Sequence, residues 1–141
     1  MSLGEAIKAS ASALNAQRAR MEIAVSNLAN AESTRGVDGQ AYRRRDVVLA
    51  SAPVGGFDAA MGRAGAIGVE VAQIVEDTEP FQRRFEPAHP DADAEGFVSV
   101  PNVDVPEEMV DMLGAARAYQ ANLTAINVIR DTVQRALELG K

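Results

Sequence analysis

Apolar residues recur at helical spacing at both ends of the chain. Near the N-terminus, a spacing of alternately four and three residues selects Leu3, Ile7, Ser10, Leu14, Gln17, Met21, Ala24 and Leu28. Near the C-terminus it selects Val105, Met109, Met112, Ala116, Tyr119, Leu123, Ile126, Arg130, Val133 and Leu137. This repeat is typical of helices that pack along a seam. The sequence therefore predicts two long terminal helices that form a coiled-coil pair.

The ends of the C-terminal helix carry their own signals. Asp104 can cap the start, Pro106 suits the first turn, and Gly140 follows the last apolar position. These signals predict a helix from about Pro106 to Leu139. At ~1.5 Å per residue it would be about 50 Å long.

The segment between the helices, residues 31–102, holds most of the glycines and all but one of the prolines. Alternating apolar residues at 67–72 and 81–86 predict half-buried strands, and 47–49 and 98–100 are shorter candidates. The Gly-rich stretch from Ala50 to Ala66 offers little to bury, so it is expected to be a mobile loop. The predicted fold is mainly α with a small β-rich insert, divided into an N-terminal helix at 1–30, the insert at 31–102 and a C-terminal helix at 103–141.

The amino-acid composition excludes several kinds of catalytic and metal site. The chain of 141 residues has no Cys and one His, which excludes thiol catalysis, zinc–thiolate sites and iron–sulfur clusters. The formal charge of −6 argues against a nucleic-acid partner. We expect no catalytic, cofactor-binding or metal-binding residues and no small-molecule substrate.

Three local patterns still deserve a chemical interpretation. Residues 91–96 resemble the start of a calcium loop, but its twelfth position is Asn102 rather than Glu, so a solvated turn is the preferred reading. His89 lies in a Pro-rich turn with no acid or nucleophile held nearby by spacing. The basic run Arg43–Arg45 is consistent with a solvated edge strand or with contact to a partner.

The chain contains no run near the ~20 apolar residues needed to span a membrane and no recognisable cleavable signal. We expect a protein that is made in the cytoplasm and is not inserted in a membrane.

Small residues flank both seams, at Ala6, Ala9, Ala11, Ala13, Ala16 and Ala19 and at Ala115, Ala118, Ala121 and Ala125. Two long helices that bury one stripe each would be marginally stable, so a multi-chain bundle is expected. Five asparagines near the seams either fix helix register between neighbours or are solvent-exposed: Asn15, Asn27, Asn30, Asn122 and Asn127.

Several stretches resemble one family. Residues 14–18 (LNAQR) and 26–31 (SNLANA) resemble the N-terminal signature of bacterial flagellar rod and hook axial proteins. Residues 42–48, 85–98 and 101–112 resemble its proximal rod members, and 115–122 (AARAYQAN) completes the C-terminal signature. The signature positions are Asn27, Asn30, Pro101, Asn102, Tyr119, Gln120 and Asn122.

The resemblance implies a structural subunit of the flagellar basal-body rod, which spans the periplasm, transmits torque from rotor to hook and encloses the export channel. It implies helical assembly with copies of itself and contacts with the other proximal rod proteins, the rod–ring adaptor and the distal rod protein. It also implies delivery by the flagellar type III export apparatus without signal cleavage. A soluble coiled-coil adaptor or export chaperone is the alternative.

Overall fold

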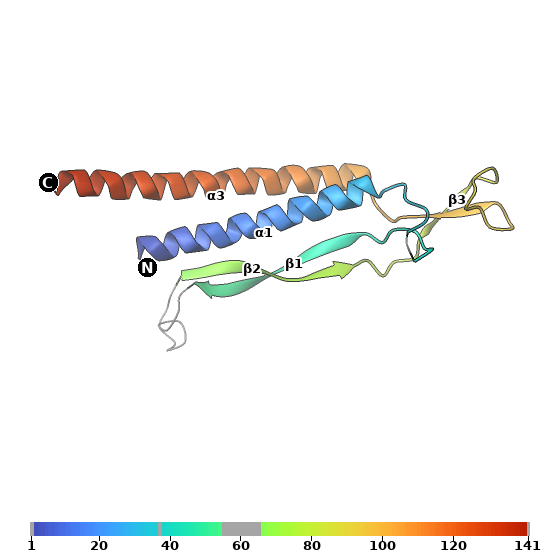
Figure 1. Cartoon of the computed structure of the whole chain (residues 1–141), viewed down its shortest axis with the longest axis horizontal. Helices are drawn as coiled ribbons and strands as arrows, with labels where there is room; N and C mark the ends of the chain where they lie inside the picture. Colours follow the sequence, from blue (N-terminus) through green and yellow to red (C-terminus); the bar gives the residue numbers. More distant parts are fainter. Residues whose placement is uncertain (1, 37, 55–65, 141) are drawn as a thin grey trace.

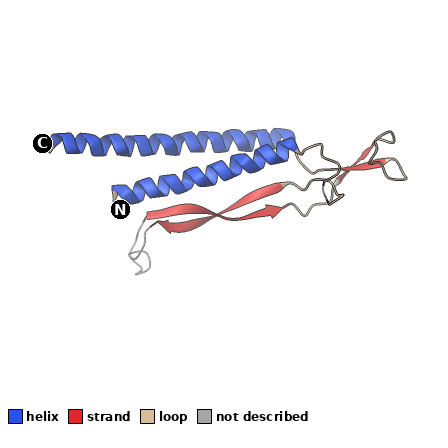
Figure 2. Cartoon of the chain, viewed as in Figure 1, coloured by secondary structure: helices blue, strands red, loops and turns tan. Residues whose placement is uncertain are grey.

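The computed structural model describes residues 2–36, 38–54 and 66–140. In chain order it contains helix α1 (Leu3–Ala29), strands β1 (Arg45–Val54), β2 (Ala66–Glu76), β3 (Gln82–Phe85) and β4 (Phe97–Val100), and helix α3 (Val105–Leu139). β1 pairs with β2 in an antiparallel ribbon, and β3 pairs with β4 in a second, shorter one. The prediction of two terminal helices around a small β insert is confirmed (Figure 2).

Side-chain caps fix where both helices begin. At α1, the Ser2 hydroxyl accepts from the Glu5 N–H at 3.2 Å, and the Glu5 carboxylate accepts from the Ser2 N–H at 2.7 Å. At α3, Asp104 accepts from the Glu107 N–H at 3.1 Å, as its position in the sequence predicts. Each cap satisfies backbone donors that the first helical turn leaves free.

The long elements lie in three layers, with α1 in the middle (Figure 1). α1 contacts α3 on one side and both strands of the β1–β2 ribbon on the other. The two chain ends lie at the same end of the molecule, and the β3–β4 hairpin lies at the opposite end. α3 is longer than α1, 35 residues against 27, and extends beyond the start of α1.

The ribbon corrects two predictions. β1 is not a short strand at 47–49 but a ten-residue strand, and the expected loop at 50–66 is wrong at its ends because residues 50–54 belong to β1 and Ala66 to β2. Residues 55–65 of that expected loop lie outside the described residues. The second correction concerns which face of β2 is covered. Ala66 and Gly68 are buried, whereas Ile67 is 71% exposed and Val71 38% exposed.

Close packing on α1 explains this inversion. A Cβ at Gly68 would lie 2.5 Å from the Ser12 hydroxyl of α1 and 2.5 Å from a methyl group of Val54. The Ser12 hydroxyl also accepts from the Val69 N–H at 3.0 Å. Only a residue without a side chain fits at this distance, so the small residues of β2 face the helix and the bulky ones face outward.

β3 was expected to be half-buried, but every residue of it is exposed. Phe85 is 63% exposed and meets Phe97 of β4 edge to face, with ring centroids 5.2 Å apart. The covered residues of this hairpin are Val98 and Val100 on β4. β3 is exposed because none of the long elements packs over it (Figure 1).

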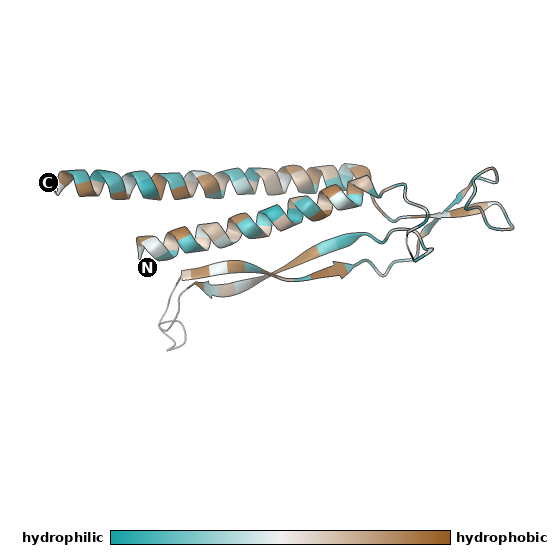
Figure 3. Ribbon diagram, viewed as in Figure 1, coloured by the Kyte–Doolittle hydropathy of each residue, from teal (hydrophilic) through white to brown (hydrophobic). Residues whose placement is uncertain are grey.

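The core is made of small side chains. The buried apolar residues are Ala16, Ala24, Ala41, Ala66, Val98, Val100 and Ala115. Hydrophobic residues nevertheless occur along the whole length of both helices and the ribbon (Figure 3). Many of the large ones are therefore left on the outside of the chain.

Candidate functional site

A buried polar junction joins three elements of the chain, and we call it the Asn27 junction (Asn27, Tyr42, Arg44, Arg45 and Glu108). The Asn27 side chain, on α1, is 1% exposed. Its amide nitrogen donates to the Arg45 carbonyl at 2.8 Å and to the Glu108 carboxylate at 3.0 Å. Its oxygen accepts from the Arg45 N–H and the Tyr42 hydroxyl, both at 3.0 Å. All four hydrogen-bonding positions of the amide are thus used.

Glu108, in the first turns of α3, is the second buried member and is 2% exposed. Its carboxylate accepts from Arg44 at 2.5 Å as well as from Asn27. The hydrogen bond to Glu108 raises the pKa of Arg44 despite the opposing effect of burial. A buried carboxylate needs such partners, because an unpaired one would carry a large desolvation cost. The junction therefore fixes the position of α1 along its axis relative to α3 and β1.

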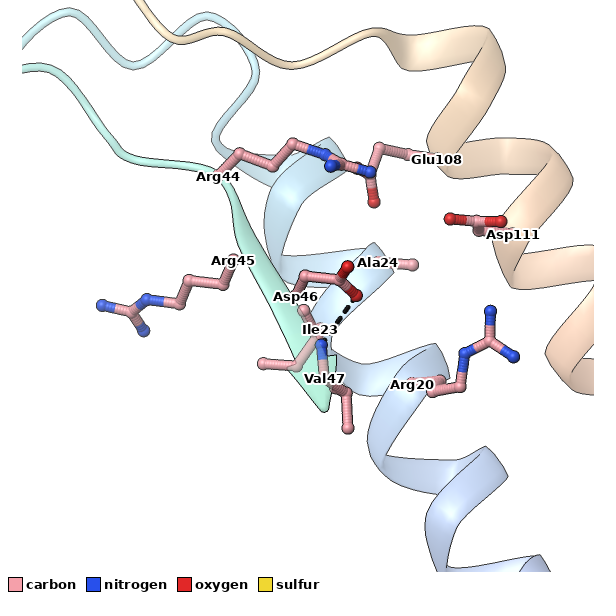
Figure 4. Close-up of a pocket in the computed structure, with 9 residues that line it drawn as sticks. All are labelled: Arg20, Ile23, Ala24, Arg44, Arg45, Asp46, Val47, Glu108 and Asp111. Atoms are coloured by element: carbon pink, nitrogen blue, oxygen red, sulfur yellow. Dashed lines mark hydrogen bonds and ion pairs between the residues drawn. The ribbon is translucent and has the colours of Figure 1, made fainter. Parts of the chain in front are cut away.

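The three arginines at 43–45 each contact another part of the chain, although Arg45 itself is exposed. Arg44 reaches Glu108, whereas the Arg45 side chain points away from it (Figure 4). Arg45 pairs with Glu76 across the ribbon at 3.2 Å, and Arg43 stacks on Phe81 with its guanidinium 4.5 Å from the ring centroid. Arg45 is exposed on a strand of a two-stranded ribbon, as a solvated edge strand predicts, whereas Arg44 is drawn into the junction; contact of this run with a partner stays a prediction.

A small hollow lies beside the junction, between the start of α3, the last third of α1 and the start of β1 (Figure 4). Arg20 and Asp111 line it from the two helices, and Asp46 lines it from β1. The Asp46 carboxylate accepts from the Val47 N–H at 2.7 Å. The hollow is lined by these charged side chains and contains no nucleophile with a neighbouring base among the residues that line it.

The seam positions differ in how far the chain itself covers them. Ala24 is buried, and the half-buried positions are Ile7, Leu14, Met21, Leu28, Met112, Tyr119, Leu123, Ile126 and Val133. The exposed ones are Leu3, Met109, Ala116 and Leu137. The buried residues of α3 are Glu108 and Ala115, each one position before an exposed seam residue. The face of α3 that packs on α1 is thus rotated by about one residue in its first third.

The asparagines and other signature positions have mostly local partners. Asn30 donates to the Ser26 carbonyl at 2.8 Å and ends α1, and Asn122 donates to the Ala118 carbonyl at 2.9 Å. Asn102 donates to Glu79 at 2.8 Å and accepts from Gln82 at 3.0 Å. Pro101 is buried, Tyr119 is half-buried, and Gln120, Asn15 and Asn127 are exposed.

The turn at 89–97 uses its polar groups locally. His89 accepts from the Asp91 N–H at 3.1 Å. Asp93 accepts from the Glu95 and Phe97 N–H groups at 2.9 Å and from Arg83 at 2.6 Å. The Phe97 hydrogen bond, with those of Glu95 and Arg83, lowers the pKa of Asp93. Across the described ranges, no three His, Asp or Glu side chains gather in a way that could hold a metal ion.

Neither described helix combines the length and the apolar character required to cross a bilayer.

Both terminal regions match known families. Residues 7–36, within and just after α1, match the family described as flagella basal body rod protein. Residues 94–139, which include α3, match the C-terminal family described as flagellar basal body rod FlgEFG protein. A two-helix chain with these matches is a structural protein of the flagellar rod class, which is not known as an enzyme family.

Relatives that match nearly the whole chain identify the particular family within this class. The chain is 45% identical to the flagellar basal-body rod protein FlgC of Salmonella typhimurium over 92% of both chains. It is 42% identical to the FlgC proteins of Yersinia enterocolitica and Bacillus subtilis over the full length of each chain. The chain belongs to the FlgC family of flagellar basal-body rod proteins. The predicted resemblance is confirmed, and the adaptor or chaperone alternative is not favoured.

Proposed function

We propose that this rod subunit assembles helically with copies of itself, with α1 and α3 forming coiled-coil layers around a central channel. The observation that carries the proposal is the apolar surface left open on the long helix. Exposed apolar residues run along α3 from its first turn to its last: Val105, Met109, Val110, Leu113, Val128, Leu137 and Leu139. A chain that functions alone would bury or replace such residues, whereas an assembly covers them.

Within this assembly, the seam residues of both helices are proposed to pack against neighbouring copies. The exposed members Leu3, Met109, Ala116 and Leu137 would make the contacts between chains, and the half-buried ones would complete contacts begun within the chain. Closely packed interiors deform little. Interlocked helices therefore resist sliding past one another and can transmit torque along the rod. This supports a drive shaft between rotor and hook.

The proposed partners follow from the same role. They are the other proximal rod proteins, the distal rod protein and the rod–ring adaptor, with the flagellar type III export apparatus delivering the chain. The proposed location is the rod where it spans the periplasm. Membership of the FlgC family supports these assignments, since the relatives are named as basal-body rod proteins.

The test uses a charge at an exposed seam position. Leu137 is 67% exposed, so Leu137→Asp leaves the isolated chain intact but places an unpaired charge in the proposed seam. Gln134→Asp, at another exposed position one turn away, is the matched control. In cells that lack the native gene, we expect the wild type and the control to be found in purified basal bodies and to support swimming, and Leu137→Asp to be absent. Wild-type chain missing from basal bodies, or Leu137→Asp incorporated as well as wild type, would contradict the proposal.

A further inference from the structure

The hollow beside the Asn27 junction lies where α1, β1 and α3 meet. Each of these elements contributes a charged side chain to its lining: Arg20, Asp46 and Asp111 (Figure 4). The volume of the hollow is about 10 Å³, which is the room that one water-sized sphere takes up. The hollow therefore admits one very small molecule or ion and nothing larger.

Two other charged residues in the lining already have partners. Arg44 and Glu108 are bonded to each other, and the second oxygen of Glu108 accepts from the Asn27 amide. Their charges are balanced inside the junction. The chemistry of the hollow is therefore decided by the three remaining side chains.

Arg20 and Asp111 lie on neighbouring helices, and both side chains are half-buried. Figure 4 draws no hydrogen bond or ion pair between Arg20 and Asp111, or between either of them and another residue that lines the hollow. Burial of a charged group is costly unless the group is hydrogen-bonded or paired. Polar groups that lie beyond hydrogen-bond distance of each other can be bridged by an ordered water.

Asp46 completes the set from the third element. One oxygen of its carboxylate accepts from the Val47 N–H at 2.7 Å. A carboxylate accepts at both oxygens, so the other oxygen can take a second donor. The hollow therefore offers hydrogen-bond donors from Arg20 and acceptors from two carboxylates.

This mixture of donors and acceptors selects the ligand. A small cation is disfavoured because the positive side chains of Arg20 and Arg44 line the same space, and a chloride ion is disfavoured by the carboxylates of Asp46 and Asp111. Water is neutral, accepts from a guanidinium and donates one hydrogen to each of two carboxylates. Waters bound inside proteins make about three hydrogen bonds, which matches the three side chains here.

We propose that the hollow binds one water molecule, which accepts from Arg20 and donates to Asp46 and Asp111. The water links α1, β1 and α3, the same three elements that Asn27 joins directly. Arg20 precedes Asn27 by seven residues, or about 10 Å along α1. Two ties at separate points hold α1 more firmly than one, because α1 can no longer pivot about Asn27. The water site belongs to the folded subunit and does not depend on how the subunit assembles.

The direct test is a crystal structure of the full chain at a resolution that shows ordered solvent. We expect one water in the hollow, about 2.6–3.2 Å from a guanidinium nitrogen of Arg20 and from a carboxylate oxygen of both Asp46 and Asp111. A direct ion pair between Arg20 and Asp111, a metal ion or chloride in the hollow, or no density there would overturn the proposal.

A double-mutant cycle tests the bridge in solution. Urea unfolding of the full chain is compared for wild type, Arg20→Met, Asp111→Leu and the double variant. Each single variant should lower the folding equilibrium constant about 5-fold, because it removes one partner of the water and leaves the other charge without compensation. The double variant should lose no more than either single one. Arg18→Met is the matched control on the exposed side of α1, where the guanidinium pairs with Glu22, and should change the constant less than about 2-fold.

A conservative variant separates a water bridge from an interaction between charges alone. Asp111→Asn removes the charge but keeps an oxygen that accepts from the water, so its stability should lie closer to wild type than that of Asp111→Leu. Additive effects of Arg20→Met and Asp111→Leu, or an equal loss for Asp111→Asn and Asp111→Leu, would overturn the proposal. Neither experiment requires assembly, so the water site and the proposed role in the rod can fail separately.

Discussion

Replacement of Asn27 by alanine should weaken the junction between α1, β1 and α3 out of proportion to the few atoms removed. Tyr42 keeps its contact with the Ser26 hydroxyl at 3.2 Å, and Glu108 keeps Arg44 at 2.5 Å. The Arg45 N–H and carbonyl lose their partner. A buried backbone group left without a partner costs about 1–3 kcal/mol. Both Arg45 hydrogen bonds are only part-buried, so each should count toward the lower half of that range, and the two together should cost about 3 kcal/mol, or roughly 100-fold in the folding equilibrium.

This loss can be measured with one intrinsic probe. The chain has no Trp and two Tyr, so Tyr119→Phe leaves Tyr42, at the junction, as the single tyrosine. In that background, urea unfolding of the full chain is followed by tyrosine fluorescence for Asn27 and for Asn27→Ala. Asn122→Ala is the matched control, because its amide donates only to the Ala118 carbonyl one turn away.

The expected result is a lower unfolding midpoint for Asn27→Ala, with a free energy change near 3 kcal/mol, and a change below about 1 kcal/mol for Asn122→Ala. Equal midpoints for Asn27→Ala and its parent would refute the reasoning. They would show that water or a rearranged side chain satisfies the Arg45 backbone at little cost.

Three further predictions address other parts of the chain. Leu123→Asp or Ile126→Asp should block motility while the subunit stays soluble, because an unpaired charge buried in the seam costs several kcal/mol; normal spreading in soft agar would count against it. His89→Ala should leave swimming unchanged, since the ring only accepts from the Asp91 N–H, and a non-motile variant would show that this turn has another role. The pKa of Asp93 is lowered in the folded chain. The contribution of its carboxylate to folding stability is therefore present at neutral pH and is lost as the pH falls through that lowered pKa. By NMR, the chemical shift of the Phe97 amide proton should change as Asp93 is protonated in the wild type and should be insensitive to pH in Asp93→Asn, and identical behaviour of both would contradict the assignment.

The helices could be predicted from the sequence because the signals that define them, apolar spacing and capping residues, are local. The apolar spacing along 105–137 and the cap at Asp104 place α3 within a residue of its observed start. Local signals also located β2 and β3, but they did not determine which side of β2 would be covered. That depended on the distance between the ribbon and α1, which only Gly68 permits at Ser12.

The Asn27 junction could not be predicted from the sequence, for a related reason. Asn27 and Glu108 are 81 positions apart, and their contact depends on how α1, α3 and β1 are placed together. The sequence identifies Asn27 as a polar residue near the seam but leaves open whether it meets a neighbour or solvent. The structure shows a third outcome, in which it fixes register within one chain. The seam spacing likewise identified the helices without specifying which face α1 covers and which is left for a neighbour.

Imaging of the intact basal body at side-chain resolution, in cells that produce this chain, tests most directly whether the chain is a rod subunit. We predict density for this chain within the rod, with α1 and α3 in layers nearest the channel and the seam residues Met109 and Leu137 against neighbouring chains. Absence of the chain from the rod, or terminal helices that face solvent on the outer surface, would contradict the central claim.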